Sequence, residues 1–297
     1  MAVIVVVFGA VTTRGFLTSG NLKAILFSGS FIGIAAVGTT AIMLSGSLFS
    51  LSFGTSISVA AIAFLASLRF GLGPAIVITL LLGIAIFGVQ GMVVGIWDAN
   101  PIIVTIAAGA AQTGFVTWLT SGAQVTSSNS SSLYQRLGGQ VFGIPSSFYA
   151  LLALALLMTF LLARTPFGRM LYLMGENRRA ARAAGLRIAW ITTGAFALAG
   201  LAASLAGVLL GAFNTTATLS IGGSYTYEAI AATLVGGNAI GGGRGSIWRA
   251  CFGAFFIASV TDLLLLRGYS RGMQILVEGI AVVVIVVVLH LASRRSR

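Results

Sequence analysis

The stretch Arg164–Arg187 reads RTPFGRMLYLMGENRRAARAAGLR and separates two apolar runs, 146–163 and 189–213. It holds six arginines and a single acid, Glu176, in a chain of which only 7% is charged. Apolar runs of roughly 20 residues are long enough to cross a bilayer as helices. The stretch is therefore expected to be a water-facing segment that links two membrane spans.

The composition of the rest of the chain is that of a membrane protein. Hydrophobic residues make up 58% of it and its mean hydropathy is +1.04, whereas about 25% of a soluble domain is charged. The apolar residues fall into ten runs: 2–13, 23–45, 52–68, 74–96, 101–119, 146–163, 189–213, 228–240, 247–266 and 273–292. They predict an all-α, polytopic helical membrane protein with one transmembrane domain over residues 1–297.

Two segments interrupt this pattern. The run 228–240, EAIAATLVGGNAI, is too short to cross about 30 Å at 1.5 Å per residue. It predicts a short broken or re-entrant segment, with ends that are buried in protein or line a wet cavity. The link 120–145 is rich in Ser, Gly and Thr, which is typical of a flexible extracytoplasmic loop.

The distribution of basic residues predicts the orientation. With residues 164–187 in the cytoplasm and the spans alternating from there, eleven of the seventeen basic residues lie inside and six outside. Cytoplasmic loops carry the excess of Lys and Arg, so both termini are expected in the cytoplasm. Topology signals and contact with anionic membrane lipid account for the net charge of +12 without nucleic acid.

A short helix is expected inside the basic stretch. Asn177 is suited to the N-cap and Gly185 to the C′ position, with about seven residues between them. Isolated helices need roughly 12–15 residues for stability in water. Arg178 and Arg179 in the first turn would each oppose the helix dipole by roughly 0.3–1 kcal/mol. We expect this helix to become stable when it docks into a groove with complementary acids; alternatively, the arginines only fix the topology.

The sequence contains no catalytic or metal-binding motif. HExxH, paired cysteines and a phosphate-binding loop are all absent, and Cys251 and His290 are each the only residue of their kind. The stretch GGNAIGGGRG lacks the Lys-Ser/Thr ending of a phosphate loop and reads as flexible backbone at the mouth of the broken segment. No metal or cofactor is expected on this chain, and any ATP hydrolysis would take place on a partner.

Polar residues in or beside the apolar runs are candidates for a translocation path, because burying an ionisable or amide group in a membrane costs free energy. Those selected are Glu228, Asn238, Gln112 and Asn214. Glu228 at the start of the short segment fits a helix cap as well as a path residue. Hydrogen bonds between helices explain the amides equally well.

Three further acids have simpler interpretations. Asp98 precedes an Asn-Pro pair and reads as a turn residue. Asp262 and Glu278 lie near Arg267 and Arg271, so we expect ion pairs at the membrane surface.

Three blocks carry a resemblance to a known family: GENRRAARAAGLRI (175–188), AFALAGLAASLAGVLLGAF (195–213) and YEAIAATLVGGNAIGGGRGSIWRACFGAF (227–255). They resemble the permease subunits of ribose- and xylose-type ABC sugar importers. FLTSGNLKAILF, IAAVGTTAIML and LSFG upstream extend the likeness, which covers about 21–293.

The resemblance implies that residues 164–187 form a cytoplasmic coupling loop, whose short helix enters a cleft of an ATPase subunit. The residues that match this element are Gly175, Glu176, Asn177, Arg178, Arg179, Ala181, Arg182 and Gly185. It also implies a bacterial inner-membrane location and import of a sugar or related small polar solute. The implied partners are a second permease, two ATPase domains that use ATP and Mg²⁺, and an extracytoplasmic solute-binding protein.

The chain departs from the family at one motif. The family carries Gly-Gly-Ile-Asp-Leu-Ser-Val-Gly after its second span, whereas residues 47–54 read SLFSLSFG, with Ser50 in place of the acid. A role that depends on that carboxylate does not carry over.

Two other classes of protein fit less well. A secondary transporter, which works without an ATPase, often has two similar inverted halves, and the basic stretch has no counterpart in the first half. Ion-gradient-driven transport by the chain alone would favour that alternative. An intramembrane enzyme would need catalytic pairs that the sequence lacks.

Overall fold

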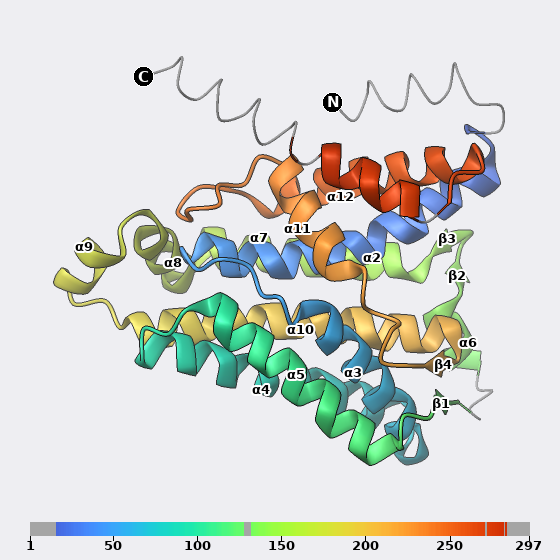
Figure 1. Ribbon diagram of the computed structural model, residues 1–297, viewed down its shortest axis with the longest axis horizontal. Coiled ribbons are helices and arrows are strands. Elements are labelled where there is room, and N and C mark those ends of the chain that lie inside the picture. The colour runs from blue at the N-terminus through green and yellow to red at the C-terminus, as the bar shows by residue number, and fades with distance from the viewer. Residues whose placement is uncertain (1–15, 128–131, 271, 282, 284–297) are drawn as a thin grey trace.

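The computed structural model describes residues 16–127, 132–270, 272–281 and 283, and it is almost wholly helical (Figure 1). Seven helices in this part of the chain are long and apolar enough to cross a membrane. They are α2 (Ser19–Leu44), α3 (Phe53–Ser67) with the 3-10 turn η1 (Leu68–Phe70), α4 (Leu72–Ile96), α5 (Pro101–Thr120), α7 (Ser146–Arg164), α10 (Ile188–Asn214) and α12 (Ile247–Leu266). Each coincides with one of the ten apolar runs, so seven predicted spans are confirmed.

The other three runs differ. The eighth run, 228–240, contains α11 (Tyr225–Val235), and at 11 residues this helix is about 16 Å long, which confirms the predicted short segment. Run 2–13 lies outside the described residues. Of run 273–292 the structure describes the first part, with a helix over Gly272–Ala281. The count of ten spans and the side of the membrane on which the termini lie stay predictions.

Apart from α11, the shorter elements named here lie at the two ends of the helical bundle (Figure 1). At one end, here called the α9 end, are α8 (Pro166–Glu176) and α9 (Arg178–Ala183). At the other, the α6 end, are α6 (Ser132–Gly138) and the strands β1 (Val125–Thr126), β2 (Gln140–Val141), β3 (Ile144–Pro145) and β4 (Thr216–Ala217). β1 pairs antiparallel with β4, and β2 with β3.

The link 120–145 is more ordered, in its described parts, than its composition indicates. Tyr134 on α6 is only 2% exposed, its ring stacks on that of Phe64, and its hydroxyl donates to the carbonyl oxygen of Gly211 over 3.4 Å. One aromatic side chain therefore anchors this Ser-rich link to the bundle, and the prediction of a flexible loop is wrong for the part around Tyr134.

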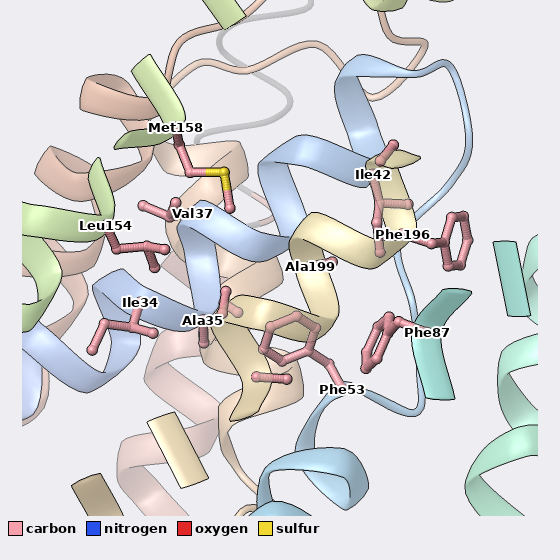
Figure 2. Close-up of a cluster of buried hydrophobic side chains, with 14 of the residues drawn as sticks. Ile34, Ala35, Val37, Ile42, Phe53, Phe87, Leu154, Met158, Phe196 and Ala199 are labelled. Atoms are coloured by element: carbon pink, nitrogen blue, oxygen red, sulfur yellow. The ribbon is translucent and has the colours of Figure 1, made fainter. Parts of the chain in front are cut away.

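The centre of the bundle is formed by α2 and α10, which lie between α11–α12 on one side and α3–α5 on the other (Figure 1). In the most apolar stretch of each helix, 78% of α2 and 72% of α10 is buried, against 22% of α4 and 17% of α5. The core includes Phe53 of α3, Phe87 of α4 and Phe196 of α10, which come together in Figure 2. α4 and α5 are therefore peripheral, and their outer faces are apolar surfaces suited to lipid.

Small residues bring α4 and α10 into contact. A Cβ atom on Gly200 of α10 would lie 2.2 Å from the carbonyl oxygen of Gly83 on α4, so neither position has room for a side chain. In lipid, where apolar surface gains little from helix association, such close packing holds helices together. The small residues of the 189–213 span therefore serve helix packing.

Candidate functional site

Four glycines join three segments at the α9 end, and we call this contact the glycine junction: Gly46, Gly175, Gly242 and Gly243. A Cβ on Gly175, near the end of α8, would lie 2.1 Å from the carbonyl oxygen of Leu44 and 2.4 Å from the backbone nitrogen of Gly243. The amide of Gly243 donates to that same Leu44 oxygen over 3.2 Å. Gly46, Gly242 and Gly243 also have positive φ angles, which favour glycine. The prediction of flexible backbone in GGNAIGGGRG is wrong here, because the stretch is packed against α2 and α8.

α8 is held firmly against the bundle. Leu171 and Met174 are fully buried, and the hydroxyl of Tyr172 donates to the carbonyl oxygen of Gly245 over 3.2 Å. Burial raises the pKa of Tyr172, so its phenol stays protonated and able to donate at neutral pH. α8 is thus a fixed base from which α9 projects.

The local signals for α9 are confirmed. The side-chain oxygen of Asn177 accepts from the amide of Ala180 over 3.0 Å, as an N-cap does. At the other end Gly185 has a φ of 82°. The amides of Gly185 and Leu186 donate to the carbonyl oxygens of Arg182 and Ala181, both over 3.0 Å, which is the Schellman pattern. The helix has six residues.

One carboxylate binds two arginines of α9, and we call Asp98, Arg178 and Arg182 the Asp98 clamp. Arg178 donates to one oxygen of Asp98 and Arg182 to the other, each over 2.6 Å. The hydrogen bond from Arg182 and the charge of Arg178 lower the pKa of Asp98. An acid of the same chain therefore compensates Arg178, whereas the sequence predicted complementary acids in a docking groove; the docking itself stays a prediction.

The role of Asp98 was missed in the sequence, where it reads as a turn residue. The sequence did contain a signal for this contact. Asp98 is one of only five acids in the chain, and if the spans alternate, it lies at the same membrane surface as the basic stretch. The three side chains of the clamp are 31–58% exposed, and exposed ion pairs contribute about 0–1 kcal/mol. The clamp therefore orients α9 more than it stabilises the fold.

The rest of the predicted coupling residues present a small, basic surface. Arg179, Ala180 and Ala183 of α9 are exposed, as is Glu176 at the end of α8. Ala181 is 5% exposed and packs toward the bundle. Gly175 and Gly185 shape the backbone on either side. Gly175 thus belongs to the fixed base, and the other seven predicted residues lie at the end of α8 or in α9 and its caps. Their part in coupling stays a prediction.

A second candidate region lies where α3 and α11 begin, near the middle of the bundle (Figure 1). α3 begins at Phe53, and a Cβ on Gly38 would touch both the Phe53 ring and Ala202. Ala202 lies halfway along the 27 residues of α10. The amide of Gly54 donates to the hydroxyl of Thr226 on α11 over 2.7 Å. Residues 45–52 and 218–224 are not helical, and they reach this region from opposite ends of the bundle before α3 and α11 begin. We call it the central break.

Neutral polar side chains gather at the central break. The hydroxyls of Ser50 and Ser52 lie 3.0 Å apart, and Ser52 donates to the side-chain oxygen of Gln90 over 2.9 Å. The side-chain nitrogen of Gln90 is buried and has no hydrogen-bond partner in the part of the chain that the structure describes. The amide of Leu51 donates to the hydroxyl of Thr105 over 3.1 Å. Broken helices inside a membrane are tolerated where protein satisfies the freed backbone groups, and the hydroxyls of Thr105 and Thr226 do so for the amides of Leu51 and Gly54.

The four predicted path residues do not lie together. Glu228 is in the first turn of α11, beside the central break, and is 7% exposed. Gln112 on α5 accepts from the hydroxyl of Ser56, in the first turn of α3, over 2.8 Å. Asn214 ends α10 near the α6 end, whereas Asn238 accepts from the amide of Ser246 at the α9 end. Their part in a path stays a prediction, and the structure brings only Glu228 and Gln112 near the break.

Two further acids, Asp262 and Glu278, accept hydrogen bonds from neutral side chains. Asn21 donates to Asp262 over 2.7 Å and Thr261 donates to Glu278 over 2.6 Å. Of their expected ion-pair partners, Arg271 lies outside the described residues. Among the residues that are described, no three His, Cys, Asp or Glu side chains assemble as a metal site.

Residues 21–289 match the family described as "Branched-chain amino acid transport system / permease component". The chain belongs to this permease family. The match covers nearly the same residues as the resemblance found in the sequence, and with the seven candidate spans it makes the chain a multi-pass inner-membrane permease.

Three relatives of the permease are named as ribose or xylose transport proteins. The ribose import permease protein of Bacillus subtilis (strain 168) is 31% identical over 198 residues, which is 66% of this chain and 62% of that protein. The ribose import permease protein of Escherichia coli (strain K12) is 30% identical over 217 residues, covering 72% and 68%. The xylose transport system permease protein of the same strain is 33% identical over 153 residues, covering 52% and 39%.

The matched region therefore spans less than two thirds of the Bacillus relative and less than half of the xylose one. No solved structure matches the chain. The predicted resemblance to ribose- and xylose-type permeases is confirmed.

Proposed function

We propose that this permease is the membrane-spanning subunit of an ATP-binding-cassette importer for a sugar or a related small polar solute. Its membership of a permease family and its ribose and xylose relatives support this reading. The observation that carries the proposal is α9, a six-residue helix that projects from the bundle, capped at both ends and clamped by Asp98.

α9 is the element on which the ATPase docks. Its exposed face combines Arg179 with Ala180 and Ala183, so a groove can approach the backbone closely and place an acid opposite the arginine. ATP and Mg²⁺ are bound by the two ATPase domains, and this chain contributes no group to hydrolysis. With the α9 end in the cytoplasm, the excess of basic residues lies inside, as the positive-inside rule requires.

The central break supplies the polar groups for the solute. Ser50, Ser52 and Gln90 offer hydroxyls and an amide without charge, which suits a neutral solute with many hydroxyls. Discontinuous membrane helices form the solute sites of other transporters at the same depth. A second permease completes the path, and an extracytoplasmic binding protein delivers the solute at the α6 end.

Co-purification of the ATPase tests the docking step. Arg179→Glu combined with Ala183→Glu should abolish binding of the ATPase, because both face outward and neither belongs to the Asp98 clamp. Arg136→Glu, an exposed charge reversal on α6 at the opposite end, is the matched control and should leave binding unchanged. Undiminished ATPase binding by the double variant would overturn the proposal. Ion-gradient-driven uptake by the reconstituted chain alone would favour a secondary transporter instead.

A further inference from the structure

α4 and α5 form a hairpin whose two helices are held very differently. α4 follows α10 closely: a Cβ on Gly91 would lie 2.8 Å from the Cα atom of Thr193, and one on Gly95 2.8 Å from that of Ala189. In α5, by contrast, only Thr105 and Val116 are buried among its 20 residues. α4 must therefore move with α10, while α5 has little packing that resists displacement.

The polar contacts of α5 lead from the α9 end to the central break. Asp98 lies three residues before Pro101, the first residue of α5, and Asn100 between them caps the helix by accepting from the amide of Ile102. Further along, Thr105 accepts from the amide of Leu51. About two turns beyond Thr105, at 3.6 residues per turn, Gln112 accepts from the hydroxyl of Ser56 on α3. α5 thus touches the break on both sides of the α3 N-terminus.

The junction between Asp98 and α5 is stiff. Asp98 has a left-handed φ of 50°, Pro101 fixes its own φ angle, and the Asn100 cap sets the start of the helix. A pull on Asp98 is therefore passed to α5 over three residues with few free torsions.

We propose that Asp98 is a positioning residue that ties the docking helix α9 to α5, so that movement of α9 by the ATPase reaches the central break along α5. This inference rests on the proposed function. It separates the two parts of the coupling loop: α8 is attached through the glycine junction to α2, and α9 is attached through the Asp98 clamp to α5.

A purely structural role for Asp98 makes a different prediction. If Asp98 only compensated the charge of Arg178 in the first turn of α9, its loss would reduce ATPase binding or the amount of folded protein. If Asp98 transmits movement, its loss leaves the ATPase bound and active but lowers the solute carried per ATP hydrolysed.

The measurement uses the assembled importer in liposomes, with the ATPase bound, and records ATP hydrolysis and solute uptake together. Asp98→Asn should lower the uptake-to-hydrolysis ratio by roughly fivefold. A fivefold change corresponds to about 1 kcal/mol, the upper limit of what an exposed ion pair contributes. Asp98→Glu, which keeps the charge, should recover much of it. Arg169→Gln, an exposed charge change on α8 outside the clamp, is the control and should keep the ratio of the unaltered protein.

A covalent bridge provides the second measurement. Cys251 is the chain's single cysteine, so Cys251→Ala leaves a background for Asp98→Cys with Arg182→Cys. Without cross-linker this variant should be uncoupled, and a short thiol-specific cross-linker should restore uptake, because the bridge replaces the ion pair.

Three outcomes would overturn the inference: an unchanged ratio in Asp98→Asn, loss of ATPase binding in that variant, or a cross-link that fails to restore uptake. If the unaltered chain does not bind an ATPase at all, the proposed function fails first. The two failures are therefore distinguishable.

Discussion

The two halves of the coupling loop, α8 and α9, are attached to the bundle by opposite kinds of contact. At the glycine junction the backbones of Gly175, Leu44 and Gly243 touch with no room for a side chain. At the Asp98 clamp, charged side chains that are 31–58% exposed meet at their tips. A backbone contact of the first kind fixes one geometry, whereas an ion pair can tilt and re-form. The comparison indicates that α8 is the fixed base and α9 the adjustable part.

Gly175→Ala should have the largest effect on stability, because it places a side chain in the glycine junction that holds α8. The added Cβ would lie 2.1 Å from the Leu44 carbonyl oxygen, and overpacking of this kind costs about 1–3 kcal/mol or more. The thermal unfolding midpoint of the purified protein should fall accordingly. Gly73→Ala on α4 is the control, since nothing lies within 4 Å of its Cβ position and Ala favours a helix by about 1 kcal/mol. Equal midpoints for the two variants would show that the junction is not tight.

Thr105→Val should come next, because it breaks the contact between α5 and the central break without changing the shape of the side chain. Thr105 is fully buried, and its loss leaves the amide of Leu51 without its acceptor. An unsatisfied buried donor costs about 1–3 kcal/mol, again measurable as a lower unfolding midpoint. Thr113→Val, at an exposed position of the same helix, should have no such cost. A midpoint unchanged in both variants would contradict the contact.

The sequence predicts well whatever depends on local chemistry. Seven spans follow from the length of the apolar runs, and the ends of α9 follow from Asn177 and Gly185, because a cap is made by residues three to five positions away. The short length of α11 was predictable for the same reason: a run too short to cross a bilayer is visible without knowing its neighbours.

What the sequence does not reveal depends on contacts between distant residues. Asp98 and Arg178 are 80 positions apart, and they meet because α4 packs along α10, with Gly95 against Ala189 where α10 leaves the coupling loop. The glycine junction is similar, because flexible glycines and closely packed ones have the same sequence. The path candidates Asn214 and Asn238 carry the same amide group as Gln112. The fold nevertheless places Asn214 at the α6 end and Asn238 at the α9 end.

Asn177→Ala tests the adjustable half of the loop at its cap. Removing the side-chain acceptor for the amide of Ala180 should cost about 1 kcal/mol of helix stability. The effect should appear as faster hydrogen exchange of the α9 amides, while those of α8 stay protected. Asn177→Asp keeps an acceptor and should restore slow exchange. Equally fast exchange in both variants would mean that the cap does not hold α9.

Salt and pH should have the smallest effect, and they should act on α9 alone. Raising the salt from 0.1 M to 1 M shortens the Debye length from about 10 Å to about 3 Å, so the Asp98 clamp should loosen by less than about 1 kcal/mol.

The pKa of Asp98 is lowered from its ordinary 3.8, first by the hydrogen bond from Arg182. A carboxylate with a lowered pKa contributes above its ordinary value, and the contribution is lost as the pH falls through the lowered one. The clamp should therefore be unchanged from pH 8 to pH 5 and weaken only below about pH 4. Hydrogen exchange of the α9 amides measures both responses against Asp98→Asn, which should show neither. A salt response of equal size in that variant would place its origin outside the clamp.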